Sequence, residues 1–209
     1  MEKLSQIEEF KEQAHPKIIF KYLEEKPQEP LLEVIQNKKE LVQKYYYPKG
    51  EDLLMFYNHQ LDHSEFWNFY DAPIELDGKI WPTSEHYFQA QKFPDFPAYQ
   101  EKIRKTPKPG VAFRMARTRQ YKIRPDWEDY KIDAMFRALR AKFSQHKKCR
   151  QVLLESGNRP LIEHTKRDSY WADGFASGKG VNMLGKLLMK VREEIQEEIR
   201  QSESTKKKQ

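Results

Sequence analysis

The feature that most limits how this chain can fold lies in residues 81–93, which read WPTSEHYFQAQKF. Pro82 followed by Thr83 indicates the start of a helix, because a hydroxyl can cap the free backbone N–H groups of a first turn. Glu85 then falls inside that turn, where the helix dipole favours a negative charge. The spacing therefore predicts a helix N-terminus here, with Glu85 in its first turn.

The predicted helix has a mixed polar face. Glu85, Phe88, Gln89 and Lys92 recur at helical spacing and share one stripe. Helix statistics alone favour a solvated face in which Glu85 is an ordinary first-turn acid. The motifs further along the chain shift the balance towards a binding site.

Two strand signals precede this helix. Residues 53–57 read LLMFY, which is typical of a short buried strand. Asp77 and Gly78 stand between IEL and KIW, and this dipeptide is the usual signal for a two-residue β-hairpin. The hairpin leads Trp81 directly into the predicted helix.

The remainder of the chain reads as mainly helical. The longest helix is predicted over residues 126–145, because apolar residues repeat there at helical spacing (Ile132, Met135, Phe136, Leu139 and Phe143). The other predicted elements are short helices at 98–105, 111–119 and 147–156, a strand at 161–164, a glycine-punctuated loop at 168–180 and a final helix from about 181 to beyond 192.

Length and composition bound the possible classes of protein. The 209 residues suffice for one sizeable domain plus an extension. The net charge of +6 permits a nucleic-acid partner without requiring one, because acids and bases interleave. The single cysteine, Cys149, excludes an internal disulfide, and no apolar run approaches the ~20 residues of a membrane span. The sequence starts without an apolar signal core, so a soluble cytoplasmic protein is expected.

The domain organisation follows from proline and charge. Residues 1–48 are predicted to be a helical N-terminal extension, with charged amphipathic helices at about 4–14 and 30–46 separated by prolines. Residues 49–200 are predicted to form the main domain. Residues 201–209 end in a lysine run and are expected to be a disordered basic tail.

Metal and thiol chemistry find little support. There is no phosphate-binding Walker loop and no GxSxG elbow. His59 and His63 are the only histidines at metal-binding spacing and have no obvious third ligand. Cys149 lies among basic residues, yet a lone cysteine of this kind is usually a bystander. We therefore expect neither a metal nor a cofactor.

The loop at 168–180, DSYWADGFASGKG, carries Asp168, Trp171 and Asp173. A solvent-facing tryptophan gains little unless it packs or stacks, so an aromatic face for a nucleoside-like ligand is one interpretation. Carboxylates and amides would then bind ribose hydroxyls. The alternative is that Trp127 and Trp171 belong to the core and the acids cap helices, which is the more common outcome for each residue taken singly.

Five ordered motifs together resemble the YbiA-like or NADAR family over about residues 53–195: WPTSEHYFQAQKF, RALRAKF, LIEHT, D-x-x-W-x-D-G and N-x-LG-x-LLM-x-xR. The resemblance implies a compact, mainly helical α+β single domain with a small sheet. It also implies N-glycosidase activity on ribosylated substrates. Two substrate classes are associated with the family: phosphorylated ribosylamino-pyrimidine intermediates of riboflavin synthesis, and ADP-ribose attached to guanine bases of nucleic acid.

The resemblance also implies roles for particular residues. The family's central acid falls on Glu85, its aromatic wall on Trp127 and Trp171, and its loop acids on Asp168 and Asp173. The lysine of its KF motif falls on Lys142. The further candidate substrate-binding residues are Asn68, Phe69, Trp81, His86, Gln89, Lys92 and Asn182. The chain departs from the family pattern at Ala172, in the loop, and at Trp67, at the expected pocket mouth.

Cleavage of an N-glycosidic bond builds positive charge on the anomeric carbon, so the site needs a nearby carboxylate and a proton for the leaving nitrogen. Glu85 is expected to stabilise that charge or to activate water. Asp168 and Asp173 are assigned to ribose hydroxyls or to leaving-group protonation, without separating the two. A Schiff-base route through Lys142 or Lys92 is an alternative, although phosphate binding is the more ordinary role for such lysines.

The partners expected are a small-molecule riboside or ADP-ribosyl substrate, with nucleic acid as a possible carrier of the latter and no membrane. A rival from another class remains open, namely a non-catalytic module that binds ADP-ribose or nucleic acid on the same aromatic surface.

Overall fold

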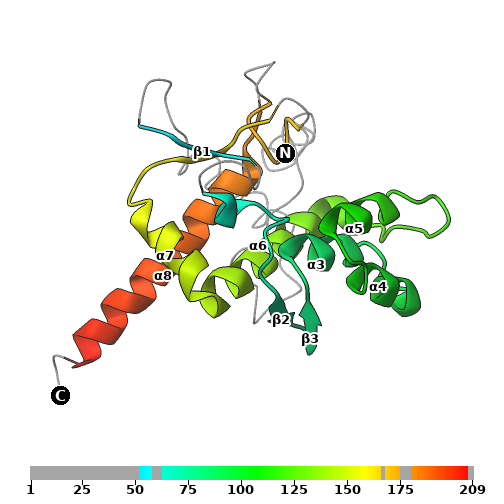
Figure 1. Cartoon of the computed structure of the whole chain (residues 1–209), viewed down its shortest axis with the longest axis horizontal. Helices are drawn as coiled ribbons and strands as arrows, with labels where there is room; N and C mark the ends of the chain where they lie inside the picture. The colour runs from blue at the N-terminus through cyan, green and yellow to red at the C-terminus, as the bar shows by residue number, and fades with distance from the viewer. Residues whose placement is uncertain (1–51, 58–62, 166–167, 175–179, 207–209) are drawn as a thin grey trace, which may run out of the picture.

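The computed structural model describes residues 52–57, 63–165, 168–174 and 180–206. Their elements, in chain order, are β1 (Leu54–Phe56), the 3₁₀ helix η2 (Ser64–Phe66), β2 (Ile74–Leu76), β3 (Lys79–Trp81), α3 (Ser84–Ala90), α4 (Pro97–Arg104), α5 (Pro109–Met115), α6 (Trp127–Gln145), α7 (Lys147–Glu155), β4 (Leu161–Glu163) and α8 (Met183–Lys206). Helix α6 runs through the middle, with α3, α4 and α5 towards one end and α7 and α8 towards the other (Figure 1). This mainly helical α+β arrangement is the fold class that the sequence predicts.

The predicted start of the central helix is confirmed. Thr83 has extended backbone angles, and its hydroxyl accepts a hydrogen bond from the backbone N–H of His86 at 3.4 Å. All residues of α3 are buried, because α4, α5 and α6 pack around it. Glu85 and Gln89 are therefore held inside the domain rather than on a solvated face.

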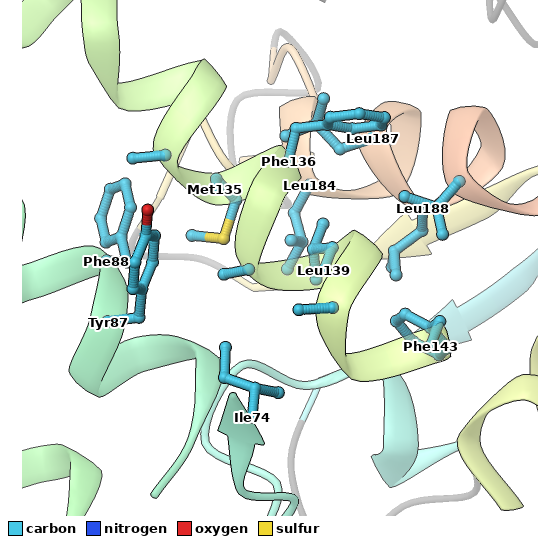
Figure 2. Packing of buried hydrophobic residues seen from close by; sticks show 14 of the residues in the cluster. Ile74, Tyr87, Phe88, Met135, Phe136, Leu139, Phe143, Leu184, Leu187 and Leu188 are labelled. Carbon is cyan, nitrogen blue, oxygen red and sulfur yellow. The ribbon is translucent and has the colours of Figure 1, made fainter. Parts of the chain in front are cut away.

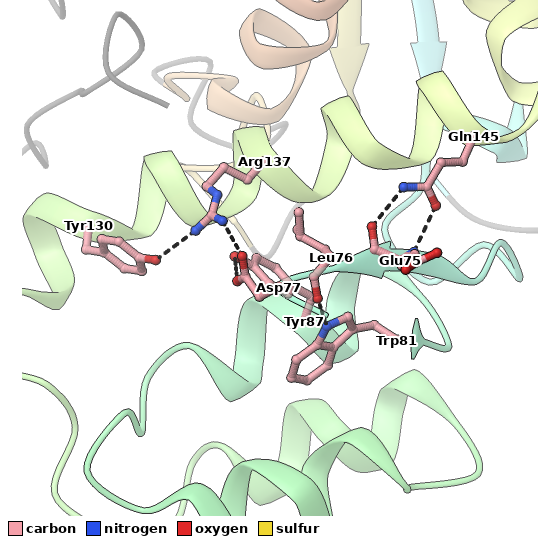
Figure 3. A network of polar contacts seen from close by, with 8 residues as sticks. All are labelled: Glu75, Leu76, Asp77, Trp81, Tyr87, Tyr130, Arg137 and Gln145. Carbon is pink, nitrogen blue, oxygen red and sulfur yellow. Dashed lines mark hydrogen bonds and ion pairs between the residues drawn. The ribbon is translucent and has the colours of Figure 1, made fainter. Parts of the chain in front are cut away.

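The hairpin is also confirmed, and it is clamped to α6. Asp77 and Gly78 have φ angles of 53° and 68°, the left-handed values that a tight two-residue turn requires. The carboxylate of Asp77 accepts hydrogen bonds from Tyr87 of α3 and Arg137 of α6. Gln145 donates to and accepts from the backbone of Glu75 (Figure 3). These contacts fix the angle at which the chain enters α3.

The second small sheet brings together two strands far apart in the sequence. β1 and β4 pair in parallel, with Leu54 opposite Leu161 and Phe56 opposite Glu163. Helix α8 packs directly on the backbone of β4, where a Cβ added at Gly185 would lie 2.0 Å from the carbonyl oxygen of Leu161. Only glycine allows this close approach.

The hydrophobic core follows the apolar repeat of α6. The side chains that the sequence pattern predicts to face the core are buried. They pack between α3 and the hairpin on one side and α8 on the other (Figure 2). The members visible there include Ile74, Tyr87, Phe88, Met135, Phe136, Leu139, Phe143, Leu184, Leu187 and Leu188.

The C-terminal boundary needs a correction. Residues 201–206 were expected in a disordered tail, but they form the last turns of α8. Glu197 accepts hydrogen bonds from Arg200 and Gln201, and such pairs at helical spacing stabilise an exposed helix end. The expected extension at 1–48 and residues 207–209 lie outside the described residues. None of the helices in the described ranges is both long and apolar enough to cross a membrane.

Candidate functional site

The described residues form a pocket of about 270 Å³ between α3, α5, α6, the end of β4 and the loop that follows β4. Its lining combines aromatic rings (Trp67, Phe69, Phe88, Phe113, Trp127 and Trp171), carboxylates (Glu85, Glu163 and Asp168), cations (Lys92, Arg117 and Lys131) and the amides Asn68 and Gln89. A concave site with flat rings and a few convergent charges suits a small polar ligand that carries a planar ring.

Helix α3 supplies the stripe that its spacing predicts. Glu85, Phe88 and Gln89 line the pocket, and Lys92 follows immediately after the helix. The side-chain nitrogen of Gln89 donates to Glu85 at 2.7 Å, and the backbone N–H of Glu85 donates to the carbonyl of Asn68 at 3.2 Å. The carboxylate is therefore held from two directions.

The pKa values of Glu85 and Lys92 are both shifted towards neutral pH. Burial raises the pKa of Glu85 to about 7, while the hydrogen bond from Gln89 and the charges of Lys92 and Arg117 act in the opposite direction. Burial lowers the pKa of Lys92 to about 8, against the pull of Glu85. A carboxylate with this pKa can exchange a proton at physiological pH, which an ordinary surface acid cannot do efficiently.

The two tryptophans are both core neighbours and pocket wall. The ring of Phe88 lies 5.0 Å from Trp127 and 5.4 Å from Trp171. Both tryptophans are partly buried against the core and still line the pocket. The ammonium of Lys92 sits 5.4 Å from the centre of the Trp127 ring. Each tryptophan therefore both packs against the core and forms part of the pocket wall, the two roles between which the sequence left the choice open.

Asp168 shapes the loop that carries Trp171. One carboxylate oxygen, Oδ1, accepts the backbone N–H groups of Tyr170 at 2.8 Å and Trp171 at 2.7 Å. This local turn positions the indole of Trp171 at the pocket. The side chain of Asp168 thus has a structural partner as well as a place in the lining.

Comparisons with known proteins show which family the chain belongs to. Residues 55–196 match the NADAR domain, over more than half of the chain. The chain belongs to the NADAR domain family. It is 50% identical over 145 residues to N-glycosidase YbiA of Escherichia coli (strain K12), covering 69% of this chain and 89% of that protein.

Two further relatives and one solved structure are similar to the chain. An N-glycosidase of Nostoc punctiforme is 38% identical over 148 residues, covering 68% of this chain and 92% of that protein. A riboflavin biosynthesis protein of Vibrio vulnificus is 42% identical over 147 residues, which cover 70% of this chain and only 40% of that longer protein. The NMR structure of E. coli YbiA superposes with a TM-score of 0.65 at 47% identity, covering 75% of this chain and 92% of that one.

The pocket of this NADAR domain gathers eight of the residues predicted from the sequence: Asn68, Phe69, Glu85, Gln89, Lys92, Trp127, Asp168 and Trp171. Lys142 is not among the lining residues. Its side chain is fully buried, its ammonium donates to the carbonyl of Trp67 at 2.9 Å, and burial lowers its pKa to about 8. It holds the backbone at the pocket-lining residue Trp67, because an ammonium buried beside apolar rings must find an acceptor.

The other four predicted residues also lie outside the pocket lining. Trp81 donates its indole N–H to the carbonyl of Leu76, within the hairpin. His86 bridges Thr83 and the carbonyl of Thr106. Asp173 lies 2.6 Å from the ring nitrogen Nδ1 of His164.

Asn182 is buried and bonds the backbone of β4 on both sides: its Oδ1 accepts from the N–H of Glu163 at 3.0 Å, and its Nδ2 donates to Leu161 at 2.8 Å. The expected direct contact of Asn182 with a ligand is therefore replaced by a structural role, because both polar atoms of its amide already have backbone partners.

Sequence reasoning missed three charged residues of the pocket. Glu163 ends β4 and was visible only as part of the LIEHT motif. Arg117 lies in a basic stretch, and its guanidinium stacks 3.4 Å from the centre of the Phe113 ring. Lys131 pairs with Glu128 and sits 4.1 Å from the centre of the Tyr170 ring. No local pattern could have placed them, since they reach the pocket from three separate elements.

Proposed function

We propose that this protein is an N-glycosidase that hydrolyses the bond between ribose and the nitrogen of a ribosylated base. The observation that carries the proposal is Glu85, a buried carboxylate of raised pKa set in a pocket walled by Trp127 and Trp171. The names of the E. coli and Nostoc relatives, which both read N-glycosidase, support it.

The site suits the charge changes of this reaction. As the base departs, positive charge develops on the anomeric carbon, and a nearby carboxylate stabilises it. Glu85 also accepts the proton of the attacking water, and Gln89 holds its carboxylate in place at 2.7 Å. Because Glu85 acts in its ionised form, activity should rise as the pH increases through about 7.

The finer proposal concerns the substrate, a phosphorylated ribosylamino-pyrimidine. The flat base stacks on the tryptophans, and the phosphate binds the cations of the pocket, Lys92 and Arg117. The printed name of the Vibrio relative, a riboflavin biosynthesis protein, supports this substrate class.

A second candidate substrate is ADP-ribose attached to guanine in nucleic acid. Residues 102–124 contain nine basic residues and no acid, and Phe113 and Arg117 from this segment line the pocket. A basic surface beside the pocket would favour a polyanionic substrate. Such binding should weaken steeply with salt, whereas turnover of a small phosphorylated riboside should not.

The experiment that tests the proposal is a substrate panel with both classes. Released base is measured by chromatography, and binding is measured in parallel by calorimetry. Release of base from either class supports the enzyme. Binding without release from every compound would overturn the proposal in favour of a non-catalytic ADP-ribose or nucleic-acid module.

A lysine route can be tested on the same substrates. Of the two lysines considered, only Lys92 lines the pocket, and its lowered pKa suits an amine that attacks the opened sugar. Borohydride reduction during turnover would trap a Schiff base as a covalent adduct on Lys92. Direct attack by water leaves no adduct, and this is the result we expect.

Trp171→Ala is expected to weaken substrate binding by about 1 to 3 kcal/mol, the range for stacking on a base. The melting temperature should fall only modestly, because Trp171 is partly buried rather than enclosed by the core. Binding is measured as KM and by calorimetry, and stability by thermal unfolding. Trp171→Phe is the matched control that keeps a flat ring. A loss of about 3 to 5 kcal/mol of stability with unchanged KM would return Trp171 to a purely structural role.

Removal of residues 1–48 is expected to leave turnover intact. The match to the NADAR domain begins at residue 55, and the pocket residues all follow it. The shortened chain is compared with the full chain by kcat/KM and by circular dichroism. A folded but inactive shortened chain would contradict this boundary.

A further inference from the structure

The pocket contains a second buried carboxyl group, that of Glu163. Glu163 lies on β4, whereas Glu85 lies on α3. Glu163 ends β4, where it pairs with Phe56 of β1 in the parallel sheet. Its backbone N–H donates to Asn182 at 3.0 Å, and its carbonyl accepts the N–H of Asp173 at 3.0 Å. Both backbone polar groups of Glu163 are therefore held by hydrogen bonds, and its side chain lines the pocket.

The carboxyl group itself has no hydrogen-bond partner among the described residues, although Glu163 is only 9% exposed. Buried carboxylates are normally paired with a cation or hydrogen-bonded to a donor. The charged groups that act on Glu163 are acids from two elements: Asp168 and Asp173 of the loop after β4, and Glu85 of α3. Of the loop acids, Asp173 is itself paired with His164.

Burial, reinforced by these acids, raises the pKa of Glu163 to about 8, so the group keeps its proton at neutral pH. Burial also raises the pKa of Glu85, but only to about 7, because Gln89 donates to it and Lys92 and Arg117 favour its charge. Two carboxyl groups in one pocket whose environments separate their protonation in this way divide into an acid and a base.

Asp168 already has a role in the loop after β4. Its Oδ1 accepts the backbone N–H groups of Tyr170 and Trp171. None of the described residues donates a hydrogen bond to its other oxygen, Oδ2, so this atom can accept a ribose hydroxyl. The two roles that sequence reasoning could not separate for the loop acids are thus distributed between Asp168 and a residue outside the loop.

We propose that Glu163 is the general acid of the reaction, which protonates the leaving nitrogen of the substrate while Glu85 receives the proton of the attacking water. This inference rests on the proposed N-glycosidase function.

The water oxygen forms a bond to the anomeric carbon as the bond from that carbon to nitrogen breaks, and the bonding electron pair goes to the nitrogen. Glu163 transfers its proton to this nitrogen, and Glu85 takes one proton from the water. The products are the free base with its new N–H bond and the ribose with its new hydroxyl. Solvent returns a proton to Glu163 and removes one from Glu85.

The pH dependence follows from the two groups. Glu85 must be ionised, so kcat/KM rises as the pH increases through about 7. Glu163 must be protonated, so kcat/KM falls as the pH increases beyond about 8. The profile of the parent protein is therefore a bell with its maximum between these values.

The variant Glu163→Gln tests the proposal because the amide keeps the size of the side chain but has no proton to transfer. On a ribosylamino-pyrimidine substrate we expect kcat to fall by at least about 100-fold, the usual scale for a positioned acid. The decline of kcat above about pH 8, measured at saturating substrate, should also disappear. kcat is compared because loss of the proton of Lys92, whose pKa is also about 8, weakens phosphate binding and so lowers kcat/KM in every variant. Glu155→Gln, an exposed acid on α7, is the matched control and should behave as the parent.

A second substrate separates proton donation from a structural role. Nicotinamide mononucleotide carries a pyridinium whose nitrogen is already cationic, so its departure needs no proton. Glu163→Gln should cleave it at close to the parental rate. An equal loss on both substrates, or a retained alkaline decline on the pyrimidine substrate, would overturn the assignment. Where the parent does not cleave the pyridinium compound, the alkaline decline alone decides.

The outcomes also distinguish this inference from the function on which it rests. A parent protein that releases no base from any riboside refutes the N-glycosidase itself. A parent that does so, with a folded Glu163→Gln variant of near-parental rate on the pyrimidine substrate, refutes only the role of Glu163. Circular dichroism and thermal unfolding of the variant establish that it is folded.

Discussion

Glu85→Gln should lower kcat by at least about 100-fold while substrate affinity changes little. The amide retains the size of the side chain and most of its hydrogen bonding, but it has neither the negative charge nor the basic oxygen. Glu85 is buried in the pocket and has a pKa of about 7, which is why its loss should affect the chemical step. Steady-state kinetics on a riboside that the parent cleaves provide the measurement.

A purely structural Glu85 would behave differently. A first-turn acid that interacts only with the helix dipole contributes about 0.3 to 1 kcal/mol of stability and nothing to turnover. Glu155→Gln is the control, because Glu155 is an exposed acid on α7 and is not part of the pocket lining. Near-normal kcat in Glu85→Gln would refute its catalytic role and move the assignment to Asp168.

Asn182→Ala should cost about 2 to 4 kcal/mol of unfolding free energy, because it leaves the N–H of Glu163 and the carbonyl of Leu161 without partners in a buried place. The backbone of Asn182 also has a φ of 53°, which asparagine tolerates better than alanine. Urea denaturation measures the loss. Catalysis should suffer as well, since β4 carries Glu163 into the pocket.

The control for this variant is Asn158→Ala, an exposed asparagine whose replacement should change stability by no more than about 0.5 kcal/mol. A stable Asn182→Ala variant with only a raised KM would contradict the structural role. That result would restore the direct contact with substrate that the sequence predicts for this residue.

The sequence by itself determined the features that depend on neighbours along the chain. The hydroxyl of Thr83 caps a helix three residues away, and Asp77 and Gly78 turn the hairpin through their own backbone angles. The apolar repeat of α6 identifies its buried face, because the period of a helix is a local property. The stripe from Glu85 to Lys92 on one face follows from the same period.

Only the tertiary structure decided which of these residues meet. Lys142 and Trp127 both lie on α6, yet Lys142 is fully buried and bonded to the backbone of Trp67, whereas Trp127 lines the pocket. Glu163 reaches the pocket because β4 pairs with β1, and because its backbone N–H donates a hydrogen bond to Asn182, the residue before α8. The acids that act on Glu163 come from distant segments, since Glu85 precedes Glu163 by nearly 80 residues in the sequence. Burial and charge at such a distance depend on packing, which no local pattern of residues specifies.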